Sequence, residues 1–341
     1  MNEQRIDPTR GVTIPVTHLP GFRTQIAIQD GVERRLLFRT WGGIGDQICA
    51  EPTLRYAQRT FKDCEFFLAS ELPEMFSHLN WKRVFDLREE TPNYRRYFLF
   101  DTITPPNDTN LVWQFFSHML VNCVDFPSLC ALRLQLPVED RPIILKPPHS
   151  DKVLKMDDNI IGGVVVHPGK HWQSKTFPKG FWDRVLAGLK VRGIRPIIIG
   201  ANADDNRGTV DVDTDGCLDL RNQISIPECV WLLQNSAVLL TNDSAPLHMA
   251  ASGNAWIGFV ATCKHPDMIT HWRRTDTGTV EWQWREKNFG KGGIWDVIDY
   301  CPNKPQKVEA EFVPPELLES WLPNPTDMAD WAHSRLNWHD D

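Results

Sequence analysis

The chain has 341 residues and a formal net charge of −7, with 41% hydrophobic and 24% charged residues. This length favours two domains over a single hydrophobic core, and the composition is that of a globular protein. The acidic balance argues against broad non-specific binding to nucleic acid. No apolar run approaches the length of about 18 residues that a membrane span requires.

The N-terminal stretch and the cysteines give the prediction for the cellular compartment. The chain begins without an apolar core of the signal-peptide kind, and its eight cysteines are scattered without a Cys-x-x-Cys pair. We therefore expect a cytoplasmic protein with reduced thiols. Of the 14 tryptophans, most lie after residue 250. They predict either the packing of a loop-rich C-terminal segment or a platform for a sugar, a base or a membrane surface.

In the first half of the chain, an extension precedes an α/β domain. Residues 1–35 carry no strong periodicity, whereas short apolar runs alternate with amphipathic stretches from residue 36 onward. We expect strands at 36–39, 65–69 and 96–100, and helices at 46–60, 71–79 and 111–124. Pro52 falls inside the first of these helices and predicts a kink there.

A proline-rich stretch at residues 141–151 predicts the linker between the two domains. After it, we expect strands at 160–167, 195–199, 238–241 and 256–260, and helices at 181–191, 227–235 and 245–252. Strands that alternate with helices predict doubly wound parallel sheets, in which ligands bind at the C-terminal ends of the strands. The predicted domains are residues 36–145 and 152–300. A Trp-rich tail, 301–341, follows them and could pack back on the first domain.

A glycine-rich turn at residues 42–46 joins the first predicted strand to its helix. Asp46 lies in the first turn of that helix, where the helix dipole favours the charged carboxylate. Such a carboxylate, held at a cleft, can take the proton of an acceptor hydroxyl, although Asp is also a common capping residue. The glycines lack the Gly-x-Gly-x-x-Gly spacing, so we do not expect a nicotinamide dinucleotide.

A second strand-to-helix turn, Asn242–His248, lies in the other half of the chain. A helix start exposes backbone N–H groups and the positive end of the macrodipole, which suits a phosphate or diphosphate. An ordinary capped turn, with Asp243 or Ser244 as the cap, explains the same spacing. Taken alone, His248 is more typical of a core histidine than of a ligand.

The segment Val166–Pro178 follows a strand and is polar and basic. Lys170 and Lys175 could neutralise phosphate charge, but the Walker A spacing is missing, and a solvated loop is the alternative. Further along, Asp211–Gly216 matches the opening of a calcium loop. The twelfth position of that loop is Asn222 instead of Glu, which favours a solvated turn over a metal site.

Three motifs together resemble glycosyltransferase family 9, the lipopolysaccharide heptosyltransferases and their relatives. Gly45–Arg55 is similar to the Gly-Asp…Pro-x-Leu-Arg opening of that family. His167–Pro178 is similar to its Lys-x-Trp-Pro loop, with Phe177 in the place of Trp. Leu232–Ala251 contains a match to its Asn-Asp-Thr-Gly-Pro-x-His-x-Ala-Ala signature. The order and spacing of the motifs agree over roughly residues 36–265.

The resemblance implies a GT-B fold, in which two Rossmann-like domains face a cleft. The acceptor would bind in the N-terminal domain and the nucleotide-sugar donor in the C-terminal one. It also implies inverting transfer with no cofactor and no obligatory metal. Asp46 would be the catalytic base, and the donor diphosphate would bind to Lys175, Asp243, Ser244, Ala245 and His248. Further candidates for contacts with donor or acceptor are Gly43, Gly45, Lys170, Asp204 and Asp205.

The predicted function is therefore inverting transfer of a sugar from a nucleoside-diphosphate donor to the hydroxyl of a glycan, lipopolysaccharide-type or lipid-linked acceptor. Peripheral contact with a membrane stays open, and so do three alternative functions. One is sugar transfer to hydroxylated DNA bases, as some viral enzymes perform, which would need a basic groove from Arg34, Arg35, Arg39, Arg55, Arg95 and Arg96. The others are a nucleotide-sugar epimerase or hydrolase, and a non-catalytic nucleotide-sugar-binding module.

Overall fold

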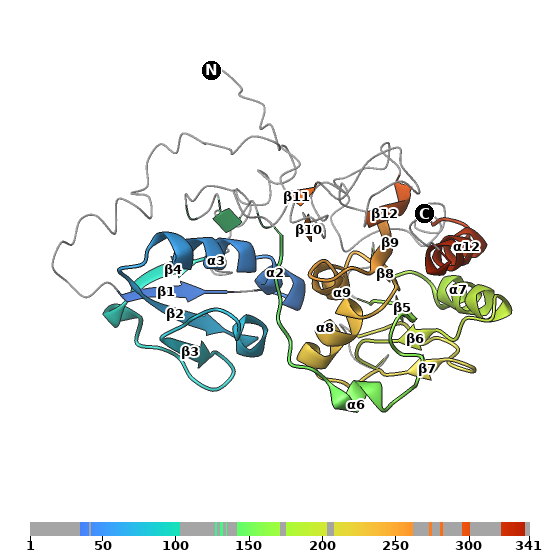
Figure 1. Ribbon diagram of the computed structural model, residues 1–341, viewed down its shortest axis with the longest axis horizontal. Coiled ribbons are helices and arrows are strands. Elements are labelled where there is room, and N and C mark those ends of the chain that lie inside the picture. Colours follow the sequence, from blue (N-terminus) through green and yellow to red (C-terminus); the bar gives the residue numbers. More distant parts are fainter. Residues whose placement is uncertain are drawn as a thin grey trace, which may run out of the picture. The chain divides into compact units, whose positions relative to one another are not determined.

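The computed structural model describes residues 35–40, 42–102, 142–170, 175–202, 208–261 and 322–337, together with 273–274, 280–281, 295–300 and the single positions 127, 130, 131 and 134. The chain divides into two compact units, which are Met1–Lys146 with His271–Val280, and Pro147–Thr270 with Glu281–Asp341. Figure 1 labels the elements of both units. The passage from the first unit to the second, at Lys146 and Pro147, falls inside the stretch predicted as a linker.

The first unit is built on a parallel sheet of four strands in the order β3-β2-β1-β4. The strands are β1 (Arg35–Arg39), β2 (Glu65–Ser70), β3 (Arg83–Asp86) and β4 (Phe98–Asp101). In the register of the sheet, Leu37 of β1 lies opposite Phe67 of β2 and Leu99 of β4. Because β1 has a neighbour on each side, Leu36, Leu37 and Phe38 are all completely buried, as expected for a continuous apolar run.

Two helices follow β1 where the sequence predicts one. The first, α2 (Ile44–Ile48), ends at Cys49, and the second is α3 (Glu51–Thr60). Pro52 lies in the first turn of α3, where its missing N–H removes no hydrogen bond. The proline therefore marks a new helix start and not a kink within one helix.

The other elements of the first unit differ in part from those predicted. A short 3-10 helix, η1 (Pro73–Phe76), takes the place of the helix predicted at 71–79, and a second one, η2 (Tyr94–Arg96), precedes β4. The strand β3 was not predicted. The helix predicted at 111–124 and nearly all of the N-terminal extension lie outside the described residues.

The second unit contains a parallel sheet of six strands in the order β12-β9-β8-β5-β6-β7. The strands are β5 (Val164–His167), β6 (Ile197–Ile198), β7 (Leu218–Asp219), β8 (Val238–Asn242), β9 (Trp256–Ala261) and β12 (Trp295–Tyr300). The first strand in sequence, β5, lies between β6 and β8, so the winding of the chain reverses there. In doubly wound sheets, ligands bind beside this switch point, at the C-terminal strand ends. A separate two-stranded sheet pairs β10 (Arg273–Arg274) with β11 (Val280–Glu281).

The helices described in the second unit begin and end with recognisable signals. They are α6 (Asp151–Leu154), α7 (Lys179–Val191), α8 (Ile226–Gln234), α9 (Ala245–Ala250) and α12 (Pro325–Leu336). A capping box starts α8: the Ser225 N–H donates to the Glu228 carboxylate, and the Glu228 N–H donates to the Ser225 hydroxyl. After α7 comes Gly193, whose φ of 75° suits the left-handed end of a helix.

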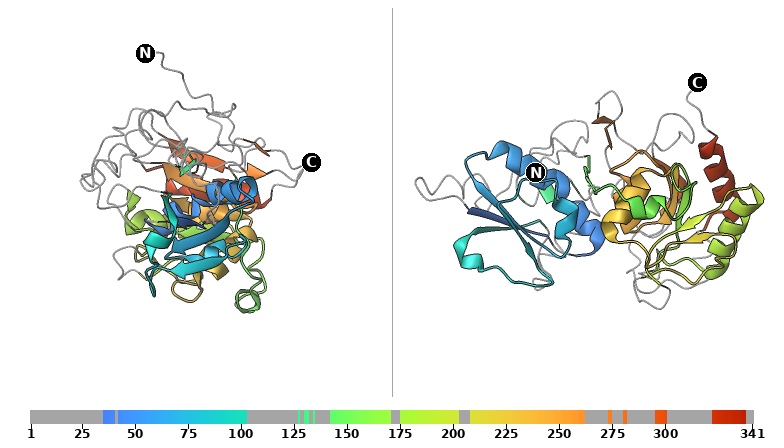
Figure 2. Two further views of the ribbon diagram at one scale, coloured as in Figure 1. Left: turned by 90° about the vertical axis from the view of Figure 1, so that its left-hand side faces the viewer. Right: turned by 60° about the horizontal axis from the view of Figure 1, so that its bottom comes forward.

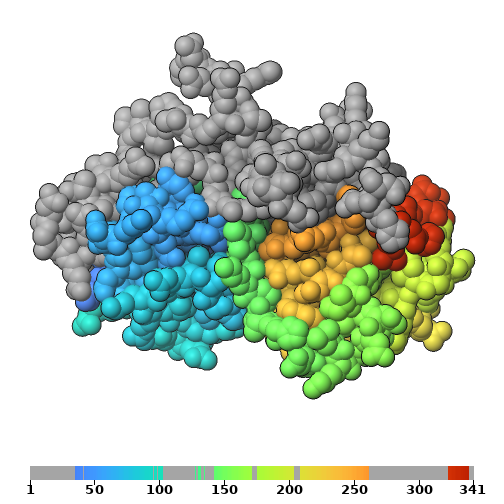
Figure 3. All heavy atoms as spheres, in the orientation of Figure 1, coloured from blue at the N-terminus to red at the C-terminus, as the bar shows by residue number. Residues whose placement is uncertain are grey.

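The C-terminal helix α12 packs along α7. Figure 2 shows the two helices side by side, and in the space-filling view α12 (red) adjoins the yellow-green residues of α7 (Figure 3). The close approach depends on Gly188 of α7, because a Cβ at that position would lie 2.8 Å from the Cβ of Ala329. The described part of the tail therefore packs within the second unit, which differs from the predicted packing on the first domain. The reason is the apolar face of α12, whose Met328, Ala329 and Ala332 are completely buried.

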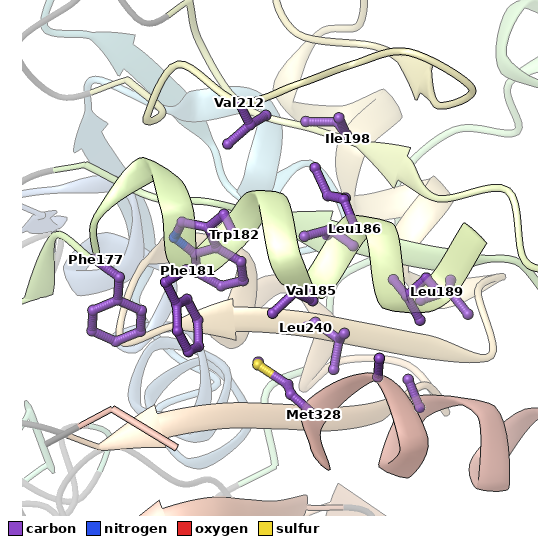
Figure 4. Packing of buried hydrophobic residues seen from close by; sticks show 14 of the residues in the cluster. Phe177, Phe181, Trp182, Val185, Leu186, Leu189, Ile198, Val212, Leu240 and Met328 are labelled. Carbon is purple, nitrogen blue, oxygen red and sulfur yellow. The ribbon is translucent and has the colours of Figure 1, made fainter. Parts of the chain in front are cut away.

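The hydrophobic core of the second unit lies between one face of the sheet and the helices α7 and α12 (Figure 4). Trp182 of α7 is completely buried there, together with Val166 of β5 and Leu240 of β8. The alternate strand residues Val165 and Leu239 face the other way and are completely buried too. On both faces the sheet is therefore covered, as doubly wound sheets require, and α9 contacts β8, β9 and α8.

These two parallel sheets with their helices confirm the predicted α/β fold class. Of the helices within the described residues, none is both long and apolar enough to cross a bilayer.

Candidate functional site

The predicted diphosphate-binding residues gather where β5 and β8 end, at the switch point of the six-stranded sheet. His167 of β5 lies opposite Thr241 of β8 in the parallel register. Because the two strands run in the same direction, the loops that follow them leave from the same edge. This common edge explains why residues from two distant segments meet here.

Lys175 and Asp243 form a buried ion pair at this edge. The Lys175 Nζ lies 2.5 Å from Asp243 Oδ2, and the two side chains are only 9% and 6% exposed. Two residues further on, Phe177 is completely buried and stacks on Trp182 with 5.8 Å between the ring centroids. This anchor fixes the chain so that the ammonium of Lys175 points at the turn after β8. The structure thus brings together two residues that the sequence predicts as ligands of one diphosphate.

Asn242, the last residue of β8, was not assigned a role from the sequence. The residue is 1% exposed, and its Nδ2 donates hydrogen bonds to the Gly169 carbonyl (3.0 Å) and the Lys175 carbonyl (2.5 Å). A Cβ at Gly169 would lie 2.5 Å from Asn242 Oδ1, so a glycine is needed opposite this side chain. The signal available in the sequence was the family signature itself, in which this asparagine precedes the acid.

A hydroxyl network surrounds His167, the residue that ends β5. Its Nδ1 lies 3.0 Å from the Ser244 hydroxyl and 3.3 Å from the Thr241 hydroxyl, and these two hydroxyls are 3.1 Å apart. Burial lowers the pKa of His167 to about 4, because charging an imidazole away from water is costly. His167 is therefore neutral at physiological pH and can hold the Ser244 hydroxyl by a neutral hydrogen bond.

The turn between β8 and α9 presents backbone groups near this network. Ser244 precedes α9 with an extended backbone (φ −155°, ψ 172°), and its hydroxyl donates to the Asn242 carbonyl at 3.2 Å instead of capping the helix. The first N–H groups of a helix have no partner within that helix, and Ala245 is the first residue of α9. His248, the last of the predicted diphosphate-binding residues, is 9% exposed inside α9, and its role stays a prediction.

The other predicted contacts of the second unit are placed only in part. The N–H of Lys170 donates to the Gly208 carbonyl at 3.0 Å, and its side chain is half-buried. Asp204 and Asp205, the predicted ribose-binding acids, lie outside the described residues.

In the first unit, Asp46 lies in the first turn of α2 and is half-buried. Its Oδ2 accepts a hydrogen bond of 2.9 Å from the N–H of Gly43, the residue that precedes the helix. Gly42 has a φ of 90°, and a Cβ there would lie 2.7 Å from the same Oδ2. Glycine at position 42 therefore lets the backbone of this turn approach the Asp46 carboxylate closely. Gly45 is buried within α2.

A second buried carboxamide, Gln47, stabilises this turn and was also not predicted. Its Oε1 accepts hydrogen bonds from the hydroxyls of Ser70 (2.8 Å) and Thr40 (3.1 Å). Its Nε2 donates to the Gly42 carbonyl at 3.1 Å. The ends of β1 and β2 are thus tied to the turn that positions Asp46.

Three of the six arginines proposed for a DNA-binding groove are paired with carboxylates. Arg39 Nε lies 2.5 Å from Asp101 Oδ1, Arg55 Nε lies 2.7 Å from Glu51 Oε1, and Arg35 Nε lies 3.5 Å from a carboxylate oxygen of Glu65. These pairs reduce the positive charge that a nucleic acid would meet. Of the other three candidates, Arg96 is exposed, whereas Arg34 and the side chain of Arg95 lie outside the described residues.

Comparison with known proteins points to one family. The model of glycosyltransferase family 9 (heptosyltransferase) matches residues 146–258, which lie almost entirely in the second unit. Among curated protein sequences, none matches this chain.

Several solved structures are similar in fold. A glycosyltransferase family 9 protein from Veillonella parvula DSM 2008 is 11% identical with a TM-score of 0.53, over 70% of this chain and 83% of that one. The Escherichia coli ADP-heptose LPS heptosyltransferase II is 13% identical with a TM-score of 0.55, over 89% and 98% of the two chains. The iron-containing dodecameric glycosyltransferase TibC from enterotoxigenic E. coli H10407 is 15% identical with a TM-score of 0.55, over 89% and 77%.

The family match and these structures confirm the predicted resemblance to glycosyltransferase family 9 and the GT-B type of fold. The site residues themselves stay predictions.

Proposed function

We propose that this chain, whose residues 146–258 match the model of glycosyltransferase family 9, transfers a sugar from a nucleoside-diphosphate donor to an acceptor hydroxyl. The observation that carries the proposal is the buried pair of Lys175 and Asp243 beside Ser244, at the switch point of a doubly wound sheet. A cation that is shielded from water beside a helix start is suited to a diphosphate.

The donor diphosphate would bind to Lys175 and the Asp243–Ala245 turn. An ammonium has three N–H donors, so Lys175 can stay paired with Asp243 and direct N–H groups at phosphate oxygens. Ser244 adds a hydroxyl that His167 and Thr241 hold in place. Low exposure strengthens each of these interactions relative to water.

The reaction would be a single displacement with inversion at the anomeric carbon. The acceptor oxygen forms a bond to that carbon, the bond from the carbon to the diphosphate oxygen breaks, and the acceptor proton passes to Asp46. Negative charge grows on the leaving diphosphate, where Lys175 stabilises it from a fixed position. One such preorganised donor is typically worth about 3–4 kcal/mol, and a general base adds roughly 10²–10⁴-fold.

The donor and the acceptor are proposed from the similar structures. Heptosyltransferase II is an ADP-heptose LPS enzyme, and TibC has been solved in complex with ADP-D-β-D-heptose. ADP-linked heptose is therefore the first donor to test, followed by other nucleoside-diphosphate sugars. We expect a glycan or lipopolysaccharide-type acceptor, in the cytoplasm.

The test compares transfer and donor binding in the same variants. Asp46→Asn keeps an oxygen that can accept the Gly43 N–H, so we expect an intact turn. We expect transfer to fall by about 10²-fold or more while the dissociation constant of the donor stays unchanged. The matched control is Asp63→Asn, which changes an exposed carboxylate of the same unit. If Asp46→Asn retains more than about a tenth of the wild-type rate, Asp46 is not the base.

The same assays distinguish the alternative functions. Release of free sugar or nucleotide without an acceptor would indicate an epimerase or hydrolase. Donor binding without transfer to any acceptor of a broad panel would indicate a binding module. Salt-sensitive transfer to hydroxylated DNA would indicate the nucleic-acid function, against which the paired arginines argue.

A further inference from the structure

Asn242 connects three segments of the second unit through a single side chain. It ends β8, and its buried Nδ2 donates to the carbonyls of Gly169 and Lys175. Both carbonyls belong to the segment that joins β5 to α7. One carboxamide therefore fixes two points of this segment to the end of β8.

Two consecutive residues contact Lys175, one at its backbone and the other at the end of its side chain. Asn242 binds the backbone carbonyl of Lys175 at 2.5 Å, and Asp243 binds its ammonium at 2.5 Å. Both contacts come from one short stretch of chain, because Asn242 is the last residue of β8 and Asp243 follows it directly. The position of the ammonium is thus set relative to the turn that follows β8.

The chemistry of the contact requires an amide. Both carbonyl oxygens accept from Nδ2. A carboxylate in its place would bring a negatively charged oxygen against two carbonyl oxygens, and an apolar side chain would donate to neither of them. Gly169 completes the fit, because a Cβ there would lie 2.5 Å from Oδ1 and 3.0 Å from Nδ2 of Asn242.

We propose that Asn242 is a positioning residue: its carboxamide fixes the backbones of Gly169 and Lys175 to the end of β8 and thereby holds the Lys175 ammonium at the turn after β8. The part of the proposal that concerns diphosphate rests on the proposed function. The part that concerns the placement of Lys175 does not.

The first test needs no ligand. Lysine reactivity toward a trace of acetic anhydride is measured by mass spectrometry in the full chain. Lys179 and Lys190 serve as internal references, because both are more exposed than Lys175. In Asn242→Leu we expect the labelling rate of Lys175 to rise about tenfold, while the references stay unchanged. An unchanged rate at Lys175 would overturn the proposal.

A matched control separates positioning from general loosening. Asn235 also donates its Nδ2 to a backbone carbonyl, that of Trp231 at 2.7 Å, in the same unit. We expect Asn235→Leu to leave Lys175 protected, and an equal rise in both variants would contradict the proposal. If Asn242→Leu fails to fold by circular dichroism, Gly169→Ala, which crowds the same carboxamide, takes its place.

The second test measures coupling with ADP as the probe. Dissociation constants are determined for wild type, Lys175→Met, Asn242→Leu and the double variant. If Asn242 acts through Lys175, the double variant binds ADP no more weakly than Lys175→Met alone, whereas additive losses would refute the proposal. If wild type binds neither ADP nor any other nucleoside diphosphate, the proposed function fails, and the labelling experiment still decides the role of Asn242.

Discussion

Lys175 is the residue on which the proposed chemistry depends most. Its ammonium and the Asp243 carboxylate are both removed from water and form an ion pair with each other. The same pair would have to admit a diphosphate. Stability and donor binding are therefore linked at one contact, and suitable variants can separate them.

We expect Lys175→Met to lower the free energy of unfolding by about 3–5 kcal/mol, because the buried Asp243 carboxylate loses the ammonium 2.5 Å away. The double variant with Asp243→Asn should recover most of this loss. ADP affinity should fall about 10- to 100-fold in both variants, because neither offers the ammonium. Denaturation and titration calorimetry measure the two effects. Recovery of affinity together with stability would contradict the assigned role of Lys175.

The buried imidazole of His167 makes stability depend on pH. Burial lowers its pKa from 6.5 to about 4, so between these values the unfolded chain binds more protons than the folded one. The stabilisation is fully present above about pH 6.5 and is lost as the pH falls toward 4. The loss amounts to about 3 kcal/mol in full.

This dependence is measured by comparing the melting temperatures of wild type and His167→Asn between pH 7 and pH 4.5. We expect a smaller decrease in the variant, since it has no imidazole to protonate. His333→Asn, which removes an exposed histidine of α12, should behave like wild type. Parallel curves for wild type and His167→Asn would show that His167 does not titrate in this way.

At the scale of elements, close packing decides two features that helix patterns alone do not. Pro52 lies in the first turn of α3 and does not kink a longer helix, because α2 has already ended at Cys49. The contact of α12 with α7 depends on Gly188. In the pattern of a single helix, this glycine stands out only as a residue of low helix propensity.

We expect Gly188→Ala to destabilise the protein, although alanine favours helix formation by about 1 kcal/mol over glycine. A Cβ there would lie 2.8 Å from the Cβ of Ala329, and such overpacking typically costs about 1–3 kcal/mol. Gly180→Ala in the same helix is the control, because its Cβ would meet only Arg184 Nη1 at an ordinary 3.6 Å. Calorimetry should show a lower melting temperature for Gly188→Ala alone. A gain in both variants would mean that α12 does not pack as described.

At the scale of the whole molecule, the protein itself would supply the positive charge that stabilises the leaving diphosphate. Lys175 and the backbone N–H groups before α9 would meet the leaving diphosphate, so we expect transfer to need no divalent cation. The rate should be unchanged after dialysis against a chelator, with untreated enzyme as the control. TibC is iron-containing, so loss of activity that iron or magnesium restores is the outcome that would contradict this expectation.

Local sequence was enough to predict the elements whose signals are local. The strands predicted at 36–39 and 238–241 are β1 and β8 within one residue at each end, because central parallel strands are continuous apolar runs. The strand β3 escaped prediction, since Arg83–Asp86 is a short edge strand with charged ends. The predicted domain bounds stay predictions.

The sequence by itself determined the α/β class, the family resemblance and the types of residue at each turn, because capping, alternation and motif spacing are written in neighbouring positions. Only the tertiary structure decided which of those residues touch. Asn242 and Lys175 are 67 positions apart, and the carboxamide that joins them acts through the parallel register of β5 and β8. Hydrogen bonds across a sheet depend on the pairing of strands, which no local pattern encodes.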